Sequence, residues 1–377
     1  MKIVADAHLP YVQDYFSSYG ELVLIPGREI TAAQVKDADM LLVRSVTVVD
    51  KNLLTRSSVR FVGSVTTGHD HVDINFLNEA GIAFSTAHGF NAPPVADYVM
   101  SVIAFLQKKK LLSNGKQRAA IIGAGQIGSL VAKKLSYLGM EILLCDPLRA
   151  EKEKNFSSID LDAISQVDLI SLHVPLTTTP THATKHFINA AFLQQQKPGC
   201  ILLNSSRGAV IHTDDLLKKG QHLHWCFDVF DPEPNIRTDI LSQAYLTTPH
   251  IAGYSIQSKM RGMAMMRDAA VAKKIIEPHT QSTPDLPSQH LSFAGKSLRW
   301  QDIVLGIFNP STISSIMKSK LISAKHKAAL FDEMRHQFNY RHEFAFTRIT
   351  ADIHPDDKKI VKQLGISYDE NFSPSSD

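Results

Sequence analysis

The sequence predicts an α/β protein with two doubly wound parallel sheets and a small C-terminal α+β segment. Short apolar runs typical of buried strands alternate with helical stretches in two successive series. A long helix is expected at each end of the second series: one over residues 91–110, which has an apolar stripe, and one over the Met- and Ala-rich residues 258–276. A polar, Pro-rich stretch over residues 277–284 then separates the remaining chain from both series.

The first series contains four expected strands, each followed by a polar or Gly-containing turn. These strands are Ile3–Ala5, Leu22–Ile25, Met40–Val43 and Phe61–Gly63. The long helix after them opens with Pro93 and Pro94, which suit the first turn of a helix but not its interior.

The second series contains five expected strands at regular spacing, with helical stretches between them. These strands cover residues 119–122, 142–145, 169–174, 201–204 and 225–229. The helix over 258–276 is expected to carry the chain back to the first domain, so the second domain is inserted into it. The expected domain limits are 1–93 with 258–284, then 94–257, and finally 285–377. In the last domain we expect a helix over 328–340, a strand over 344–350 and a frayed tail over 373–377.

Composition excludes several functional classes for this chain of 377 residues. Hydrophobic residues make up 44% and charged residues 20%, which is ordinary for a soluble globular protein. Net charge is only +3 and the basic run Lys108–Lys110 is short, so no nucleic-acid partner is expected. The chain has neither a signal-peptide pattern nor an apolar run long enough for a membrane span, which favours a cytoplasmic protein. Its three cysteines lie singly in apolar runs, which indicates reduced core thiols and no metal site.

A glycine-rich loop follows the first strand of the second series. Residues 123–128 read Gly-Ala-Gly-Gln-Ile-Gly, with a helical stretch directly after them. Such a loop lets the backbone approach a pyrophosphate at a helix N-terminus, which predicts that the inserted second series is a Rossmann-like dinucleotide domain. The first series is expected to form a flavodoxin-like substrate domain. Asp146 follows the next strand, where a carboxylate would bind the ribose hydroxyls and repel a 2′-phosphate, so NAD is favoured over NADP. Arg149 lies close in sequence and weakens that preference somewhat.

An Arg, a Glu and a His each stand just after a strand-like run, at Arg207, Glu233 and His250. Taken singly, each has a simpler explanation as a surface ion pair, a turn carboxylate or one of 17 histidines. Ligands of open α/β sheets bind beyond the carboxyl ends of the strands, so the three can converge. Arg suits a carboxylate, His suits proton transfer near neutral pH, and Glu can orient the His.

Several segments resemble the D-2-hydroxyacid dehydrogenase family in order and spacing. They are Gly123–Gly128, His173–Leu176, Asn204–Gly208, Asp228–Pro234 and Pro249–Gly253. Further similarity around Val43–Thr47, and in the C-terminal segment at Phe331–Arg335 and Tyr340–Arg341, implies a member with a phosphorylated hydroxy acid as substrate. It also implies that the C-terminal domain mediates homodimerisation.

The resemblance implies specific roles for the site residues. His250 would take the C2 hydroxyl proton, Glu233 would orient it, and Arg207 would bind the substrate carboxylate. NAD would be bound by a set of residues around the strand ends: Gly123, Gly125, Gln126, Ile127, Gly128, Asp146, Val174, Ser205, Ser206, Arg207, Asp228 and Gly253. The substrate would contact Ser45, Thr66 and Tyr254.

Two questions stay open at this level. Arg44 and Arg341 are both hypotheses for the ligand of the substrate phosphate. The alternatives for function are a phosphoglycerate or glycerate dehydrogenase of the same family, and a non-catalytic NAD-sensing protein of the corepressor type.

Overall fold

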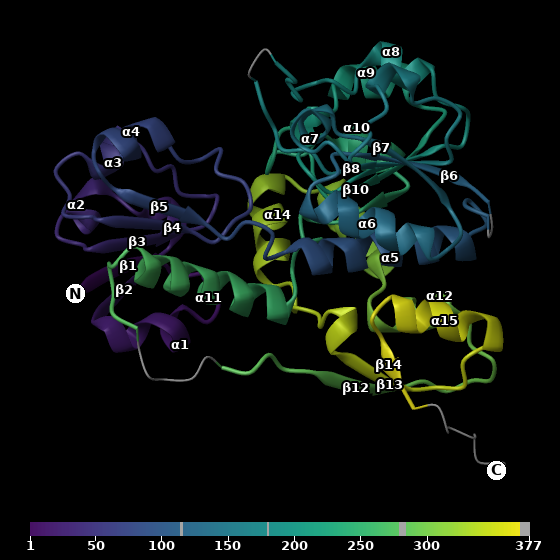
Figure 1. The fold of residues 1–377 in the computed structure, drawn as a ribbon. Coiled ribbons are helices and arrows are strands. Elements are labelled where there is room, and N and C mark those ends of the chain that lie inside the picture. The colour runs from purple at the N-terminus through teal and green to yellow at the C-terminus, as the bar shows by residue number, and fades with distance from the viewer. Residues whose placement is uncertain (114–115, 179–180, 279–283, 370–377) are drawn as a thin grey trace. The chain divides into compact units, whose positions relative to one another are not determined.

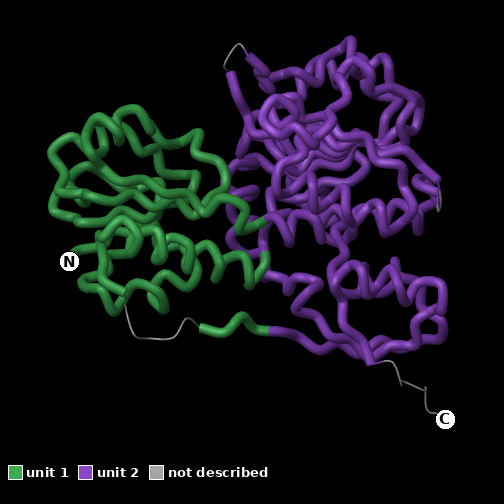
Figure 2. The backbone as a smooth tube through the Cα atoms, viewed as in Figure 1, with its two compact units in different colours: residues 1–91, 255–287 green, residues 92–254, 288–377 purple. Residues whose placement is uncertain are grey.

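The computed structural model describes residues 1–113, 116–178, 181–278 and 284–369. Two compact units are present: residues 1–91 with 255–287, and residues 92–254 with 288–377 (Figure 2). The chain therefore leaves the first unit after Asn91 and returns to it at Ser255. Part of the expected linker over 277–284, and the expected tail over 373–377, lie outside the described residues.

The first unit contains a five-stranded parallel sheet (Figure 1). Its order is β2-β1-β3-β4-β5, which is the flavodoxin-like order. The strands are β1 (Lys2–Asp6), β2 (Glu21–Ile25), β3 (Met40–Val43), β4 (Phe61–Ser64) and β5 (Ala83–Thr86). The four expected strands are confirmed, and β5 is an addition that its half-buried Ala-Phe-Ser-Thr sequence did not indicate.

Helices cover the first sheet on both faces, and one of them comes from much later in the chain. They are α1 (Val12–Phe16), α2 (Ala32–Val35), α3 (Lys51–Leu54), α4 (Ile74–Glu79) and α11 (Ile256–Ala272). A capping box begins α11, because Ser255 Oγ accepts from the Ser258 N–H at 2.9 Å and Ser258 Oγ accepts from the Ser255 N–H at 3.2 Å. Met263 and Met266 of α11 are fully buried in the same apolar cluster as Phe61 of β4. This packing explains why the expected helix over 258–276 belongs to the first unit.

The second unit contains a six-stranded parallel sheet of order β11-β10-β9-β8-β6-β7. Its strands are β6 (Arg118–Ile122), β7 (Glu141–Cys145), β8 (Leu169–Leu172), β9 (Ile201–Asn204), β10 (His224–Phe227) and β11 (Leu246–Thr247). The order reverses between β6 and β8, which is where doubly wound sheets bind nucleotides. All five expected strands are confirmed, and four of them are buried along nearly their whole length, as parallel strands covered on both faces are.

The helices of this sheet are α5 (Ala92–Lys108), α6 (Gln126–Ser136), α7 (Pro147–Lys152), α8 (Ala190–Gln194), α9 (Thr213–Lys219) and α10 (Thr238–Gln243). Most of α5 is buried, including Tyr98 and Met100. The helix expected over 91–110 is thus a core helix of the second unit.

The C-terminal residues form a second, smaller sheet within this unit. Its elements are β12 (Gln289–Ser292), α12 (Trp300–Ile307), α13 (Pro310–Leu321), α14 (Lys327–His336), β13 (Thr347–Thr350), α15 (Pro355–Gln363) and β14 (Ser367–Tyr368). We expected an α+β segment, but the strands pair in parallel as β12-β13-β14, because each connection crosses over through helices. The strand expected over 344–350 begins with a 3₁₀ turn at Phe344–Phe346.

Buried polar contacts attach this segment to the helices of the second unit. Asp97 of α5 accepts a hydrogen bond from the Phe344 N–H at 2.8 Å and pairs with Lys134 Nζ of α6 at 2.9 Å. The same ammonium donates to the Leu364 carbonyl oxygen at 2.7 Å. Because these charges are paired and bonded inside the protein, they specify one arrangement of the segment on α5 and α6.

Arg341 is a second buried attachment point. Its guanidinium lies 4.5 Å from the centre of the Phe308 ring, and its Nη atoms donate to four backbone carbonyls. The acceptors are Pro94 at 2.6 Å, Ala252 at 2.8 Å, Tyr254 at 2.9 Å and Ile251 at 3.4 Å. The hypothesis that Arg341 binds the substrate phosphate is therefore wrong, because its fork is already bonded to the backbone and the side chain is buried.

The composition also led to expectations about membrane-spanning helices and about the cysteines. None of the helices in the described ranges combines the length and the apolar character that crossing a membrane requires. Cys145, Cys200 and Cys226 are buried free thiols, and burial raises their pKa values to about 11, 12 and 12. They are core residues, as expected.

We expect Arg341→Met to lower the free energy of unfolding by about 3 kcal/mol or more, because buried carbonyls lose a charged donor. Urea unfolding followed by tryptophan fluorescence measures this, since both tryptophans, Trp225 and Trp300, lie in the second unit. Arg348→Met is the matched control, because that arginine is exposed on β13 and should change stability by less than about 0.5 kcal/mol. Equal urea midpoints for Arg341→Met and Arg348→Met would contradict the structural role assigned to Arg341.

Candidate active site

The glycine-rich loop joins β6 to α6 at the point where the strand order reverses. Gly123 has φ +89°, and a Cβ there would stand 2.7 Å from the His173 carbonyl carbon. A Cβ at Gly128 would stand 1.9 Å from the Gly123 oxygen, whereas one at Gly125 would meet nothing within 4 Å. The loop is therefore packed tightly against the sheet and open on the outside. Open space at the N-terminus of an 11-residue helix is what a pyrophosphate requires.

Asp146 lies beside this loop at the end of β7. One carboxylate oxygen accepts from the Ala124 N–H at 2.8 Å and the other from the Arg149 N–H at 3.0 Å. Arg149 in turn donates to the Ala124 oxygen at 2.7 Å and to Ser129 Oγ at 2.9 Å. Both side chains expected to influence the ribose are thus held at the loop. Their roles toward a bound cofactor stay predictions.

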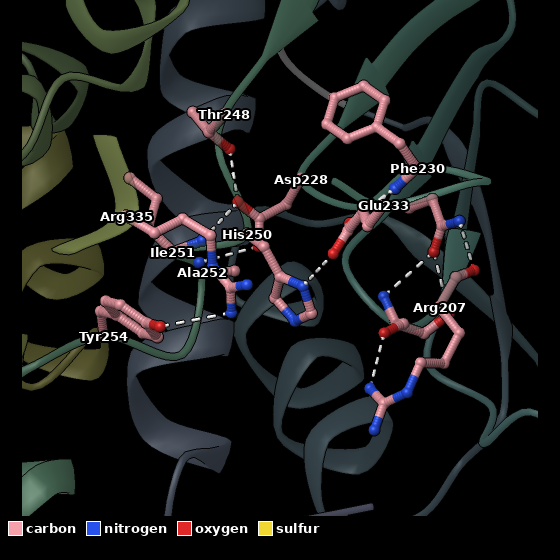
Figure 3. Close-up of polar contacts among 12 residues, drawn as sticks. Arg207, Asp228, Phe230, Glu233, Thr248, His250, Ile251, Ala252, Tyr254 and Arg335 are labelled. Atoms are coloured by element: carbon pink, nitrogen blue, oxygen red, sulfur yellow. Dashed lines mark hydrogen bonds and ion pairs between the residues drawn. The ribbon is translucent and has the colours of Figure 1, made fainter. Parts of the chain in front are cut away.

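Glu233 and His250 form a hydrogen-bonded pair at the ends of neighbouring strands (Figure 3). His250 Nδ1 lies 2.8 Å from Glu233 Oε2, and Glu233 Oε1 accepts from the Phe230 N–H at 2.9 Å. Burial would raise the pKa of the Glu233 carboxyl, but the charges of His250 and Arg335 and these hydrogen bonds hold it below its usual range. A carboxylate at this position fixes the proton on Nδ1 and leaves Nε2 to act on a substrate.

Asp228 determines the backbone conformation of His250. This carboxylate is buried, and it accepts from the Ile251 and Ala252 N–H groups at 2.8 Å each and from Thr248 Oγ1 at 2.6 Å. Burial raises the pKa of Asp228, against the charge of His250 and these bonds. His250 has φ +57°, a left-handed conformation that needs such support outside glycine. Asp228 was expected at the nicotinamide, and its role in shaping the loop is an addition.

Arg207 follows β9 and lies on the Glu233 side of the imidazole in Figure 3. Its Nη1 donates to the Ser206 oxygen at 2.9 Å. The buried Asn204 side chain donates to the Arg207 oxygen at 2.9 Å and accepts from the Ser206 N–H at 3.0 Å. The three expected catalytic residues therefore follow β9, β10 and β11, which are adjacent in the sheet.

Several of the remaining expected residues lie just beyond strands. Val174 follows β8, Ser205 has a buried Oγ without a hydrogen-bond partner in the described chain, and Gly253 follows the His250 loop. In the first unit, Thr66 Oγ1 donates to the Gly68 oxygen at 2.6 Å, just beyond β4. Ser45 follows β3, directly after Arg44, whose Nε donates to Asp6 at 2.7 Å. Their contacts with ligands stay predictions.

Arg335 is a site residue that sequence reasoning missed. It lies on α14, and its Nη2 donates to Tyr254 Oη at 3.4 Å (Figure 3). Its charge is among the causes that lower the pKa of Glu233. The segment Phe331–Arg335 was noted only as a mark of resemblance, because nothing in its own pattern shows that the helix reaches the active site.

Comparison with known proteins identifies the class. Residues 103–252 match the family model of the D-isomer specific 2-hydroxyacid dehydrogenase NAD-binding domain. A 3-phosphoglycerate dehydrogenase from Entamoeba histolytica, solved with NAD⁺ bound, superimposes with a TM-score of 0.62 at 22% identity, covering 74% of this chain and 99% of that one. The fold and the site thus define an NAD-dependent 2-hydroxyacid dehydrogenase.

Closer relatives narrow the class. An erythronate-4-phosphate dehydrogenase from Coxiella burnetii (strain RSA 331 / Henzerling II) is 38% identical over 358 residues, which is 93% of this chain and 95% of the relative. One from Chromohalobacter salexigens is 40% identical over 275 residues, 72% of each chain. The chain belongs to the erythronate-4-phosphate dehydrogenase family.

We expect Glu233→Gln to lower kcat/KM by about 10²- to 10³-fold, because the amide no longer stabilises the protonated imidazole. Initial rates of NADH formation with a 2-hydroxy acid that the wild type oxidises measure this. Glu333→Gln, at an exposed glutamate of α14, is the control and should match the wild type. Unchanged kcat/KM in Glu233→Gln would refute the orienting role.

We expect His173 to make stability depend on pH. Its Nδ1 is buried without a partner in the described chain, and burial lowers the pKa of the imidazole to about 3. The unfolded chain therefore binds a proton near pH 6.5 that the folded chain refuses. The contribution of His173 to the free energy of unfolding is fully present above pH 6.5. It decreases as the pH falls from 6.5 to about 3, by up to about 1.4 kcal/mol per pH unit.

Urea midpoints from pH 7.5 to 4.5 test this, and His173→Gln should flatten that part of the profile. His326→Gln, at an exposed histidine, should not. If the urea midpoints of the wild type and of His173→Gln depended on pH in the same way, His173 would not be the source of the pH dependence.

Proposed function

We propose that this protein oxidises 4-phospho-D-erythronate to (R)-3-hydroxy-2-oxo-4-phosphooxybutanoate with NAD, as a step of pyridoxal 5′-phosphate (vitamin B6) biosynthesis. The observation that carries the proposal is the bonded pair Glu233–His250 in a chain that matches erythronate-4-phosphate dehydrogenases over 93% of its length. The names of these relatives specify the substrate, and the pair supplies the base that the oxidation of an alcohol needs.

The residues divide the chemistry as follows. NAD, held by the Gly123–Gly128 loop and Asp146, supplies the hydride acceptor when bound. His250 Nε2 takes the proton of the C2 hydroxyl, and the Glu233 carboxylate stabilises the imidazolium that results. Arg207 binds the substrate carboxylate beside C2, where its planar fork orients the reacting carbon.

Further contacts belong to the same proposal. The substrate would also contact Ser45, Thr66 and Tyr254, of which the first two follow β3 and β4. The cofactor would be bordered by Val174, Ser205, Ser206, Asp228 and Gly253 in addition to the loop. Arg44 stands next to Ser45 and remains a candidate for an anionic group of the substrate, although Asp6 accepts two of its N–H groups at 2.7 and 3.3 Å.

The active form proposed here is a cytoplasmic homodimer assembled through the C-terminal segment. Exposed Ile316 and Ile322, on and just after α13, support an interface on this segment. Buried unpaired cysteines support a reducing compartment.

The test is a steady-state assay of NADH absorbance with 4-phosphoerythronate, with NAD and NADP in parallel. The wild type should turn over this substrate faster than 3-phosphoglycerate, glycerate and unphosphorylated erythronate, and should prefer NAD. His250→Gln, with NAD binding checked by fluorescence, should lose about 10²-fold or more in kcat. A preference for phosphoglycerate or glycerate would point to another member of the family. If wild type and His250→Gln were equally inert on every acid, a non-catalytic NAD-binding role would replace the enzyme.

A further inference from the structure

Arg335 differs from the other arginine of the C-terminal segment that lies near the active site. Arg341 directs its Nη atoms to four backbone carbonyls, so it holds the structure together. Within the described residues, the Arg335 side chain makes one hydrogen bond, from Nη2 to Tyr254 Oη, and it is long at 3.4 Å. Its guanidinium carbon lies 5.8 Å from the centre of the Phe331 ring.

The Nε–H groups of Arg335 and Arg341 are both buried without a hydrogen-bond partner in the described residues, so the difference between the two arginines lies in their Nη atoms. A buried guanidinium with a single long hydrogen bond is costly and rare in native proteins, so that of Arg335 calls for an explanation such as an absent ligand. A guanidinium presents its donors as a rigid fork that matches the oxygens of a carboxylate or a phosphate. The chemistry of this group therefore indicates an oxyanion as the missing partner.

The position of Arg335 indicates which oxyanion. Figure 3 shows Arg335 and Tyr254 on one side of His250 and Arg207 on the other. A hydroxy acid that carries a phosphate at its far end has one anion beside the reacting carbon and one several bonds away. Two arginines on opposite sides of the base suit such a molecule, with Arg207 at the near anion and Arg335 at the far one.

We propose that Arg335 binds the phosphate end of the substrate and that Tyr254 Oη holds the guanidinium in place for it. The inference rests on the proposed function and deepens it. The two sheets of the α/β domains then supply the chemistry common to 2-hydroxyacid dehydrogenases, and the C-terminal segment supplies the preference for a phosphorylated acid. Arg44 and Arg341, the two phosphate ligands considered from the sequence, are less suited to this role. The guanidinium of Arg44 is paired with Asp6, and that of Arg341 is bonded to backbone carbonyls.

The experiment compares Arg335→Gln and Arg335→Lys with the wild type on 4-phosphoerythronate and on unphosphorylated erythronate. The ratio of kcat/KM for the phosphorylated over the unphosphorylated acid should fall about 10- to 100-fold in Arg335→Gln, mostly through KM. Arg335→Lys should recover part of it, because it keeps the charge and loses the fork. Inorganic phosphate should inhibit the wild type competitively and the Gln variant much less. Arg348→Gln, at an exposed arginine of the same segment, should leave the ratio and the inhibition unchanged.

The outcomes separate this inference from the function it rests on. If wild type does not oxidise 4-phosphoerythronate, the proposed function fails. If wild type does, but Arg335→Gln loses kcat equally on both acids and shifts the pH profile, Arg335 acts only through Glu233 and the inference is overturned. An unchanged ratio overturns it as well. Thermal melting curves are measured in parallel. If Arg335→Gln melts well below the wild type, the inference is judged on Arg335→Lys, which must show a kcat/KM ratio between those of the wild type and of Arg335→Gln.

Discussion

The backbone of the loop that carries His250 is hydrogen-bonded to two buried side chains of opposite charge, to one through its N–H groups and to the other through its carbonyl oxygens. The Asp228 carboxylate accepts the N–H groups of Ile251 and Ala252, and the Arg341 guanidinium donates to the carbonyl oxygens of the same two residues. This peptide segment therefore connects a buried anion of the nucleotide-binding sheet to a buried cation of the C-terminal segment. Neither charge could stay buried without the other groups that it bonds. The left-handed backbone of His250, and with it the contact to Glu233, depends on this arrangement.

The parallel sheets could be predicted from the sequence because their strands are buried on both faces. Such strands are continuous apolar runs, as Met40–Val43 and Ile201–Asn204 show. The strands β5 and β12 were missed because they are half-buried or exposed and contain Ser, Thr, Gln and His, which in a sequence look like loop residues. The parallel pairing of the C-terminal sheet was also missed, since a short run such as Thr347–Thr350 does not reveal the direction of its partners.

The candidate site could be predicted in part for a related reason. The positions of Arg207, Glu233 and His250 after strands follow from the chain, and parallel strands end at one edge of a sheet. What Asp228 and Arg335 do could not be predicted, because their contacts join residues 20 or more positions apart. Arg341 was misjudged because an arginine in a sequence does not show whether its fork meets a ligand or the backbone.

The three buried cysteines have a practical consequence for labelling the protein. All three thiols are buried, and burial raises their pKa values, whereas alkylating reagents attack an accessible thiolate. We therefore expect the natural chain to react slowly with maleimides while it stays folded. A single cysteine introduced on the surface of the C-terminal segment would carry a fluorophore alone. The native thiols would become reactive only on unfolding, so that the rate of their modification reports how often the core opens.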